Sequence, residues 1–283
     1  MVKKKGIHPA ILVVWAAVLA AASMLPSLPL IGTGYTFSVA SALTPLCGVL
    51  FGPIYGAITA IIGGILGQIL APQTAWFGIF SFIPGTVTAV SAGLLIRGKS
   101  LGLFVHIGII IVATIIWFST SIGMAAYLMP MVGYSLGCII SVGGFLMIKM
   151  KSLTNQNALM KVVCMWMICF GAIYSGVAVG NLFGLFILQL PAEMWIFVTF
   201  IAPIERAIFA VGATIIGLPL LIILPKIGIF VGPAAMEDNQ EVDEVNDEGY
   251  ETLVEDQDEN KDEDNDENKD DAEDKNEDEN LTN

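Results

Sequence analysis

The apolar part of the sequence contains one pair of adjacent ionisable residues, Glu205 and Arg206. Because a charge is costly at membrane depth, such residues are functional candidates by default. Pro203 is typical of the first turn of a helix, so the pair is predicted at the outer end of a final helix, where both side chains could contact a polar solute. Arg206 shares its predicted helical face with three small residues, Ala210, Ala213 and Gly217, so it is expected to point inward. In the alternative role, Glu205 complements the helix dipole and Arg206 extends to the membrane interface.

A second polar candidate, Gln68, continues a row of small residues in the stretch Leu46–Pro72. The row leaves one helical face bare enough for close packing against neighbouring helices. Its members are Gly56, Ala60, Gly63, Gly64 and Gly67. The Gln68 amide needs a hydrogen-bond partner on such a face, and that partner is either a neighbouring helix or a bound solute.

Further polar and aromatic residues are predicted on the same outer side. Asn181 would complete a polar rim, while Tyr35 and Trp76 are either interface anchors or platforms on which a solute stacks. The candidate substrate-binding residues are therefore Tyr35, Gln68, Trp76, Asn181, Glu205 and Arg206.

The sequence has little provision for acid–base, nucleophilic or metal chemistry. Its two histidines, His8 and His106, are far apart and have no carboxylate at a useful offset. The four cysteines lie in apolar segments without a C-x-x-C pair, which is typical of small buried residues. We therefore predict no catalytic residues, no metal ligands and no cofactor, and a protein that is not an enzyme.

The composition divides the chain into an apolar body and an acidic tail. Hydrophobic residues make up 55% of the sequence, and the mean hydropathy is +0.75, as expected of an integral membrane protein. Of the 26 acidic residues, 24 lie in 237–283. Residues 1–233 are predicted to form a transmembrane helical domain. Residues 234–283 are predicted to be a disordered cytoplasmic tail, because they cannot bury enough apolar surface to offset their chain entropy.

The expected fold class is all-α, a polytopic transmembrane bundle of about eight helices with a cytoplasmic N-terminus. The apolar segments are Pro9–Leu25, Phe37–Phe51, Ile54–Leu70, Phe77–Ile96, Leu101–Phe118, Met131–Ile148, Ala158–Val179 and a last one ending near Leu224. The first segment is expected to be retained rather than cleaved, and a Phe51-Gly52-Pro53 hairpin joins the second to the third. The predicted location is the plasma membrane of a prokaryotic cell.

The positive charges favour this topology. With the N-terminus inside, the loops and flanks on the cytoplasmic side hold nine Lys and Arg residues and the outer loops hold none, as the positive-inside rule requires. The nine are Lys3, Lys4, Lys5, Arg97, Lys99, Lys149, Lys151, Lys161 and Lys226.

The region Gly180–Leu224 is too long for one span, because its 45 residues would make a helix of about 68 Å. We expect a loop or re-entrant segment before Pro203 and a last crossing over Ile204–Leu224. The alternative is a ninth crossing through Asn181–Ile201, which would place the tail outside.

One motif is rejected on its context. Gly93–Ser100 matches the phosphate-binding pattern G-x-x-x-x-G-K-[ST], which requires a strand before the loop and a helix after it. Here the match lies at the end of an apolar segment, so any nucleotide energy must come from another chain.

These features together resemble the substrate-binding S components of energy-coupling-factor (ECF) transporters of vitamins and micronutrients. The resemblance lies in the Ala-rich first segment, the Pro/Gly loop Pro26–Thr36, the Leu-Phe-Gly-Pro-x-x-Gly-Ala run Leu50–Ala57, and the small-residue helix ending Gly-Gln-Ile-Leu. It covers Pro9–Lys99 well and Lys161–Lys226 loosely. The family commonly has six helices, so Leu101–Phe118 and Met131–Ile148 look like an inserted pair.

The resemblance implies a subunit that captures a small solute near the outer leaflet and passes it inward with energy from two separate ATPase subunits. The pairs Ala16/Ala20 and Ala17/Ala21 would contact a transmembrane T subunit. Membrane lipid would be a further partner, and nucleic acid would not. Two alternative functions remain open, an autonomous small-solute permease and a membrane anchor or assembly protein that recruits partners through its acidic tail.

Overall fold

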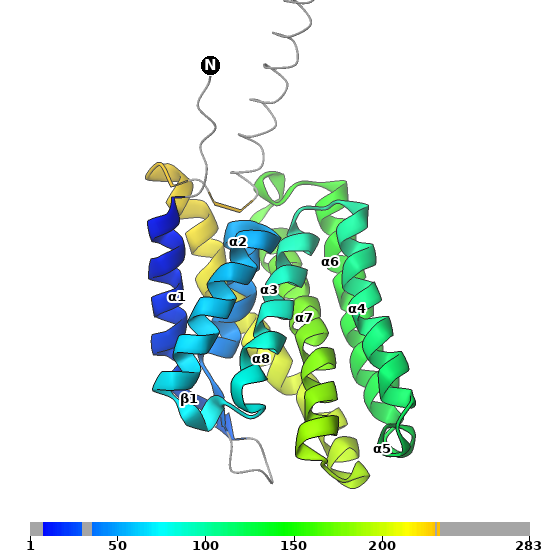
Figure 1. Ribbon diagram of the computed structural model, residues 1–283. Helices are drawn as coiled ribbons and strands as arrows, with labels where there is room; N and C mark the ends of the chain where they lie inside the picture. The colour runs from blue at the N-terminus through cyan, green and yellow to red at the C-terminus, as the bar shows by residue number, and fades with distance from the viewer. Residues whose placement is uncertain (1–7, 30–35, 230, 233–283) are drawn as a thin grey trace, which may run out of the picture. The chain divides into compact units, whose positions relative to one another are not determined.

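The computed structural model describes residues 8–29, 36–229 and 231–232, and it is built of apolar helices that follow one another along the chain (Figure 1). The main helices are α1 (Pro9–Ser23), α2 (Ala40–Leu70), α3 (Phe82–Ile96), α4 (Ser100–Phe118), α5 (Ser121–Ala125), α6 (Ser135–Met150), α7 (Ala158–Phe183) and α8 (Ala192–Lys226). Short helical turns are η1 (Pro72–Thr74), η2 (Gly78–Ser81), η3 (Met129–Tyr134), η4 (Leu153–Asn155) and η5 (Gly184–Leu188). Two short strands, β1 (Pro26–Pro29) and β2 (Thr36–Ser38), pair antiparallel between α1 and α2.

Six helical stretches in the described part of the chain are long and apolar enough to cross a membrane, so this is an all-α bundle of the multi-pass membrane type. The helix count differs from the expected eight for two reasons. The predicted segments Phe37–Phe51 and Ile54–Leu70 form the single element α2, and α1 has only 15 residues. Lys3–Lys5, Tyr35 and the predicted tail, 234–283, lie outside the described residues.

Within α2 the chain turns back on itself at Gly52. This residue has φ 77° and ψ −179°, a conformation that favours glycine, and Pro53 follows it. A Cβ atom added at Gly56 would lie only 2.5 Å from the carbonyl oxygen of Cys47. In a continuous helix these two residues would be about 13 Å apart along the axis, so α2 consists of two arms joined by the predicted Phe51-Gly52-Pro53 hairpin.

Small residues allow α1 to pack closely on the second arm of α2. A Cβ atom at Gly63 would lie 2.8 Å from the Cβ of Leu19 and 3.0 Å from the carbonyl oxygen of Ala16. Ala16 and Ala20 are accordingly buried within this chain, while Ala17 and Ala21 are exposed. In this conformation α2 covers Ala16 and Ala20, so only Ala17 and Ala21 are open to another protein, and contact of the four alanines with a partner stays a prediction.

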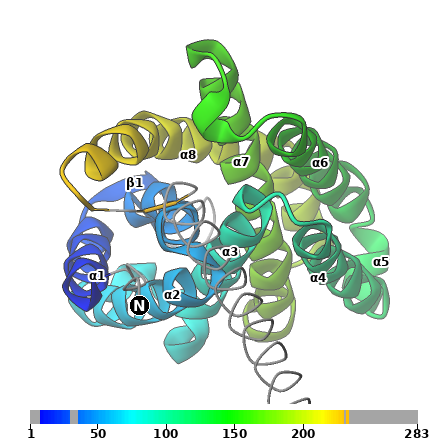
Figure 2. The same cartoon turned by 90° about the horizontal axis from the view of Figure 1, so that it is seen from above.

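The predicted inserted pair corresponds to α4 and α6. Figure 2 shows these helices next to α3 and α7, with α1 on the other side of α2. Hydrogen bonds between side chains join several of these elements. Ser175 of α7 bonds Ser91 of α3 at 2.7 Å, His106 of α4 bonds Ser141 of α6 at 3.1 Å, and Asn181 of α7 bonds Tyr134 of η3 at 3.1 Å. Such bonds satisfy polar groups that would otherwise be buried in hydrocarbon.

The last helix begins much earlier than the sequence predicts. After the short turn η5, Gln189 has a left-handed φ of 49°, and α8 then runs without a break from Ala192 to Lys226. Pro203 lies inside this helix, so the prediction that it starts the helix is wrong. Membrane helices tolerate internal proline because neighbouring groups satisfy the freed backbone. As a result, Glu205 and Arg206 lie more than three turns into α8 rather than at its end.

Candidate solute-binding site

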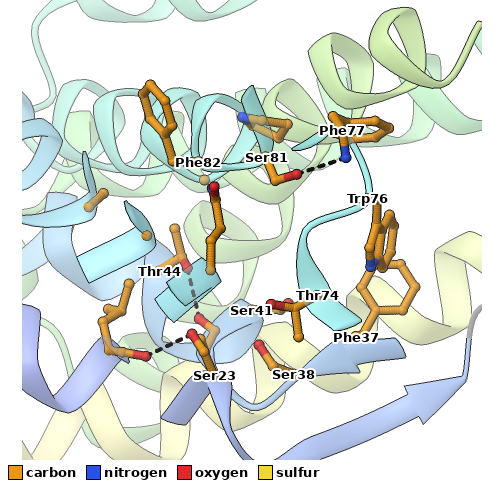
Figure 3. A pocket seen from close by; sticks show the side chains of 17 residues that line it. Ser23, Phe37, Ser38, Ser41, Thr44, Thr74, Trp76, Phe77, Ser81 and Phe82 are labelled. Carbon is orange, nitrogen blue, oxygen red and sulfur yellow. Dashed lines mark hydrogen bonds between the residues drawn. The ribbon is translucent and has the colours of Figure 1, made fainter. Parts of the chain in front are cut away.

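A cavity of about 190 Å³ lies between the end of α1, the start of the first α2 arm, the end of the second α2 arm and the start of α3. Its wall is rich in hydroxyl groups, several of which Figure 3 shows around the hollow, Ser23, Ser38, Ser41, Thr44 and Thr74. Ser23 and Thr44 donate to carbonyl oxygens one turn earlier in their own helices, at 3.0 and 2.7 Å. Their oxygens therefore remain able to accept hydrogen bonds from a solute.

A second cavity, of about 150 Å³, adjoins the first and extends towards α7 and α8. The two share part of their lining, namely Phe37, Ser41, Thr44, Trp76, Phe77, Pro84 and Gly85. The second cavity adds Thr88, Asn181, Arg206 and Phe209 to these. Taken together, the cavities reach the lower end of the size range of small-molecule sites, about 300 Å³.

Aromatic rings form part of the wall that the two cavities have in common. Phe37 and Trp76 lie side by side with ring centroids 4.3 Å apart in an edge-to-face arrangement (Figure 3). Phe37 also meets Phe209 at 5.7 Å, and Trp76 meets Phe77 at 6.2 Å. Such rings give a solute a rigid apolar surface with little loss of conformational freedom.

Arg206 is the charged residue of the site, and its side chain is only 9% exposed. Its guanidinium carbon lies 4.3 Å from the centroid of Phe37, a cation–π contact. The ion pair with Glu205 is loose, because Nη1 and Oε2 are 3.8 Å apart, beyond hydrogen-bond distance. Nε is buried and has no hydrogen-bond partner among the described residues. The guanidinium therefore has donor capacity that the protein leaves unused.

Gln68 has its hydrogen bonds satisfied by the protein backbone, although it lines the first cavity. With the amide turned so that both of its atoms are paired, the oxygen accepts from Phe82 N at 2.7 Å and the nitrogen donates to Gly78 O at 3.3 Å. Gln68 thereby ties the end of α2 to the start of α3. The geometry favours the helix-packing role over direct solute contact, which the sequence left open.

Replacing Gln68 by leucine is expected to destabilise the protein by about 1–3 kcal/mol, because two backbone groups lose their partner. Denaturant unfolding of the purified protein in detergent measures this. Gln73→Leu is the matched control, since Gln73 is exposed in η1, and a surface change of this kind is expected to stay within about 0.5 kcal/mol. Equal effects of the two variants would contradict the tie between α2 and α3.

The structure brings together four of the six predicted binding residues around the two cavities, Gln68, Trp76, Asn181 and Arg206. Glu205 is not in the lining of either cavity and lies beside Arg206. Tyr35 is outside the described residues. Whether any of these residues binds a solute stays a prediction.

Sequence reasoning missed Phe37 and the hydroxyl groups. Ser38 ends β2 and Ser41 lies in the first turn of α2, where serine is ordinary, and no spacing separates them from capping or turn residues. Ser81 was equally inconspicuous, although its Oγ accepts from Phe77 N at 2.7 Å. The small residues of the second α2 arm predicted close packing of helices, and two of them, Ala60 and Gly64, line the first cavity.

Apart from Arg206, the basic residues of the described helices and loops lie at the end of the bundle opposite the cavities. Ser23, Gln68 and Asn181 come near the C-terminal ends of α1, α2 and α7, and Ser41 and Phe82 near the starts of α2 and α3. These basic residues lie at the other ends of the helices, namely Arg97 and Lys99 between α3 and α4, Lys149 in the last turn of α6, Lys151 just after α6, Lys161 early in α7, and Lys226 at the end of α8.

Comparison with known proteins shows a relative but no known family. No model of a known protein family matches the chain, and no solved structure matches it. The chain is similar to a protein of Methanocaldococcus jannaschii named Uncharacterized protein MJ0923, with 29% identity over 182 residues. The match covers 64% of this chain and 60% of the relative, so it spans less than two thirds of the relative's length.

Proposed function

We propose that the chain is the substrate-binding subunit of an ECF-type importer for a vitamin or another micronutrient. In this role it captures a small solute near the outer leaflet and passes it inward with energy from separate ATPase subunits. The observation that carries the proposal is the pair of adjoining, polar-lined cavities at one end of an apolar helical bundle. Small-molecule sites are typically concave, largely preformed and lined by aromatic groups with a few polar ones.

The proposed orientation places these cavities on the outer side. Counting α1, both arms of α2, α3, α4, α6, α7 and α8, the chain would cross the membrane eight times and start in the cytoplasm. The basic residues between and after these helices would then all be cytoplasmic, in line with the positive-inside rule. Because the cavities lie at the opposite end, a solute would reach them from outside.

In this proposal ATP hydrolysis is carried out by other chains. The phosphate-loop match Gly93–Ser100 runs from the last turn of α3 to the first residue of α4, with no strand before it, which does not fit a nucleotide cradle. A transmembrane T subunit and two ATPase subunits would supply the energy. The exposed pair Ala17 and Ala21 on α1 offers a small-residue face for the T subunit.

The experiment that tests the proposal purifies the full chain with an affinity tag from its native host. We expect a transmembrane protein and two ATPases to co-purify, and mass spectrometry to identify a small solute extracted from the complex. Proteoliposomes that contain this complex should then accumulate the solute only when ATP is enclosed in the vesicle lumen, on the side of the membrane where the ATPases lie. Uptake by the chain alone would support an autonomous permease instead, and the absence of any solute or uptake would support an anchor protein.

A further inference from the structure

The second cavity contains an unsatisfied cation. Among the described residues that line either cavity, Arg206 is the only ionisable one, and the rest of the lining is aromatic, aliphatic, small or neutral polar. Its side chain is only 9% exposed, and its Nε has no hydrogen-bond partner in the described part of the chain. A guanidinium carries five donors in a planar fork that matches a carboxylate.

The neighbouring carboxylate does not use this fork. Glu205 precedes Arg206 by one position, which places it about 100° away around the helix, so the two side chains leave different faces of α8. Their closest approach is 3.8 Å, and Glu205 is absent from the lining of both cavities. Glu205 therefore balances the charge of Arg206 from outside the cavity and leaves the inner side of the guanidinium open.

The surroundings of Arg206 add two recognition features. Phe37 lies against the guanidinium, and Phe37 and Trp76 together present an aromatic wall to both cavities. Asn181 Nδ2 donates one hydrogen bond to Tyr134 Oη at 3.1 Å, so its second hydrogen is able to donate into the cavity that it lines. A positive fork, an amide donor and an aromatic wall together fit a planar anion.

We infer that the solute is a small organic acid. Its carboxylate would lie in the second cavity against Arg206 and Asn181, an unsaturated or ring portion would lie along Phe37 and Trp76, and its neutral polar part would reach the hydroxyl groups of the first cavity. This inference rests on the proposed function only in assuming that the cavities bind a solute, and it names the chemical class of that solute. A charge-assisted bidentate contact in a water-poor site is the strongest recognition that this lining provides.

The test measures binding of matched acids and amides to the full chain purified in detergent. The probes are nicotinate with nicotinamide, para-aminobenzoate with para-aminobenzamide, indoleacetate with indoleacetamide, and biotin with biotinamide. Each pair differs mainly in the negative charge. We expect at least one acid to raise the midpoint temperature of unfolding and to bind by calorimetry, while its amide binds at least about tenfold more weakly, because only the acid forms a charge-assisted pair with the guanidinium.

Variants locate the effect at Arg206. Arg206→Gln should weaken binding of that acid by about tenfold to a hundredfold and leave binding of the amide unchanged. Glu205→Gln should retain or tighten acid binding, since it removes only the counter-ion outside the cavity. Arg97→Gln is the control, because it removes the same charge from an exposed residue at the opposite end of the bundle. If Arg206→Gln does not fold, the acid–amide comparison and Glu205→Gln still decide the question.

Three results would overturn the inference, namely amides that bind as tightly as acids, unchanged acid binding by Arg206→Gln, or no acid that binds at all. These outcomes are separate from a failure of the proposed function. An acid that binds to a chain without associated ATPases would leave the inference standing and remove the importer. A neutral solute recovered from an ATPase-containing complex would do the reverse.

Discussion

Gly48→Ala is expected to prevent normal folding of the bundle. A Cβ atom at position 48 would meet the carbonyl oxygen of Ala89 on α3 and would lie 2.6 Å from the backbone nitrogen of Gly93. Both neighbours are backbone atoms, so no side-chain rotation relieves the overlap and the first arm of α2 must move away from α3. We expect a loss at or above the upper end of the usual cost of overpacking, about 3 kcal/mol. Thermal unfolding monitored by size-exclusion chromatography in detergent measures it.

Gly108→Ala is the matched control for this prediction. Gly108 is also a helical glycine, in α4, but no atom would lie within 4 Å of its added Cβ. The same methyl group should therefore be tolerated there, and it removes backbone freedom from the unfolded chain. A normal unfolding temperature for Gly48→Ala, or equal losses for the two variants, would show that α2 and α3 are not packed as the structure has them.

Ala17→Trp is expected to reduce ATP-driven solute uptake by at least about tenfold while leaving solute binding intact. Ala17 lies on the exposed face of α1, away from the cavities and away from the buried contact with α2. An indole group on a small-residue face prevents the close helix approach that such faces permit. If that face docks on a T subunit, the variant should lose both co-purification of the ATPases and uptake in proteoliposomes.

Two further variants serve as controls for Ala17→Trp. Ile111→Trp introduces the same side chain on the exposed face of α4, where Ile111 is already 52% exposed, and should not affect uptake. Ala16→Trp should instead unfold the protein, because Ala16 is 1% exposed beneath Gly63. Normal uptake by Ala17→Trp would contradict the predicted role of α1.

The sequence predicted the helical, apolar character of the chain and the turn at Gly52 because both depend on local chemistry. A Gly-Pro step after an apolar run is a strong local signal, and the long apolar segments need no tertiary information. The positions of Gln68 and Arg206 on inward faces followed from small residues at helical spacing. Both residues indeed line cavities, although those cavities are built mainly by residues that carried no such signal.

The predictions that failed depend on tertiary context. Proline is common in the first turn of a helix and is also tolerated inside membrane helices. Pro203 alone therefore could not show that α8 begins at Ala192. On α1, Ala16 and Ala20 pack against α2 while Ala17 and Ala21 are exposed, and helical spacing alone could not show which pair α2 covers. Gln68 was left open between two roles for the same reason, because its partners, Phe82 and Gly78, are provided by a later part of the chain.

The prolines of α8 distinguish it from its neighbour α7, which has none. Pro203, Pro219 and Pro225 lack an amide hydrogen, so the carbonyl groups four residues before them have no helical partner. Bending at Pro203 therefore costs no amide hydrogen bond from that residue, and this position is less than one turn from Arg206. The backbone that carries the buried cation can thus bend more easily than α7, and hydrogen–deuterium exchange should be faster along α8 than along α7.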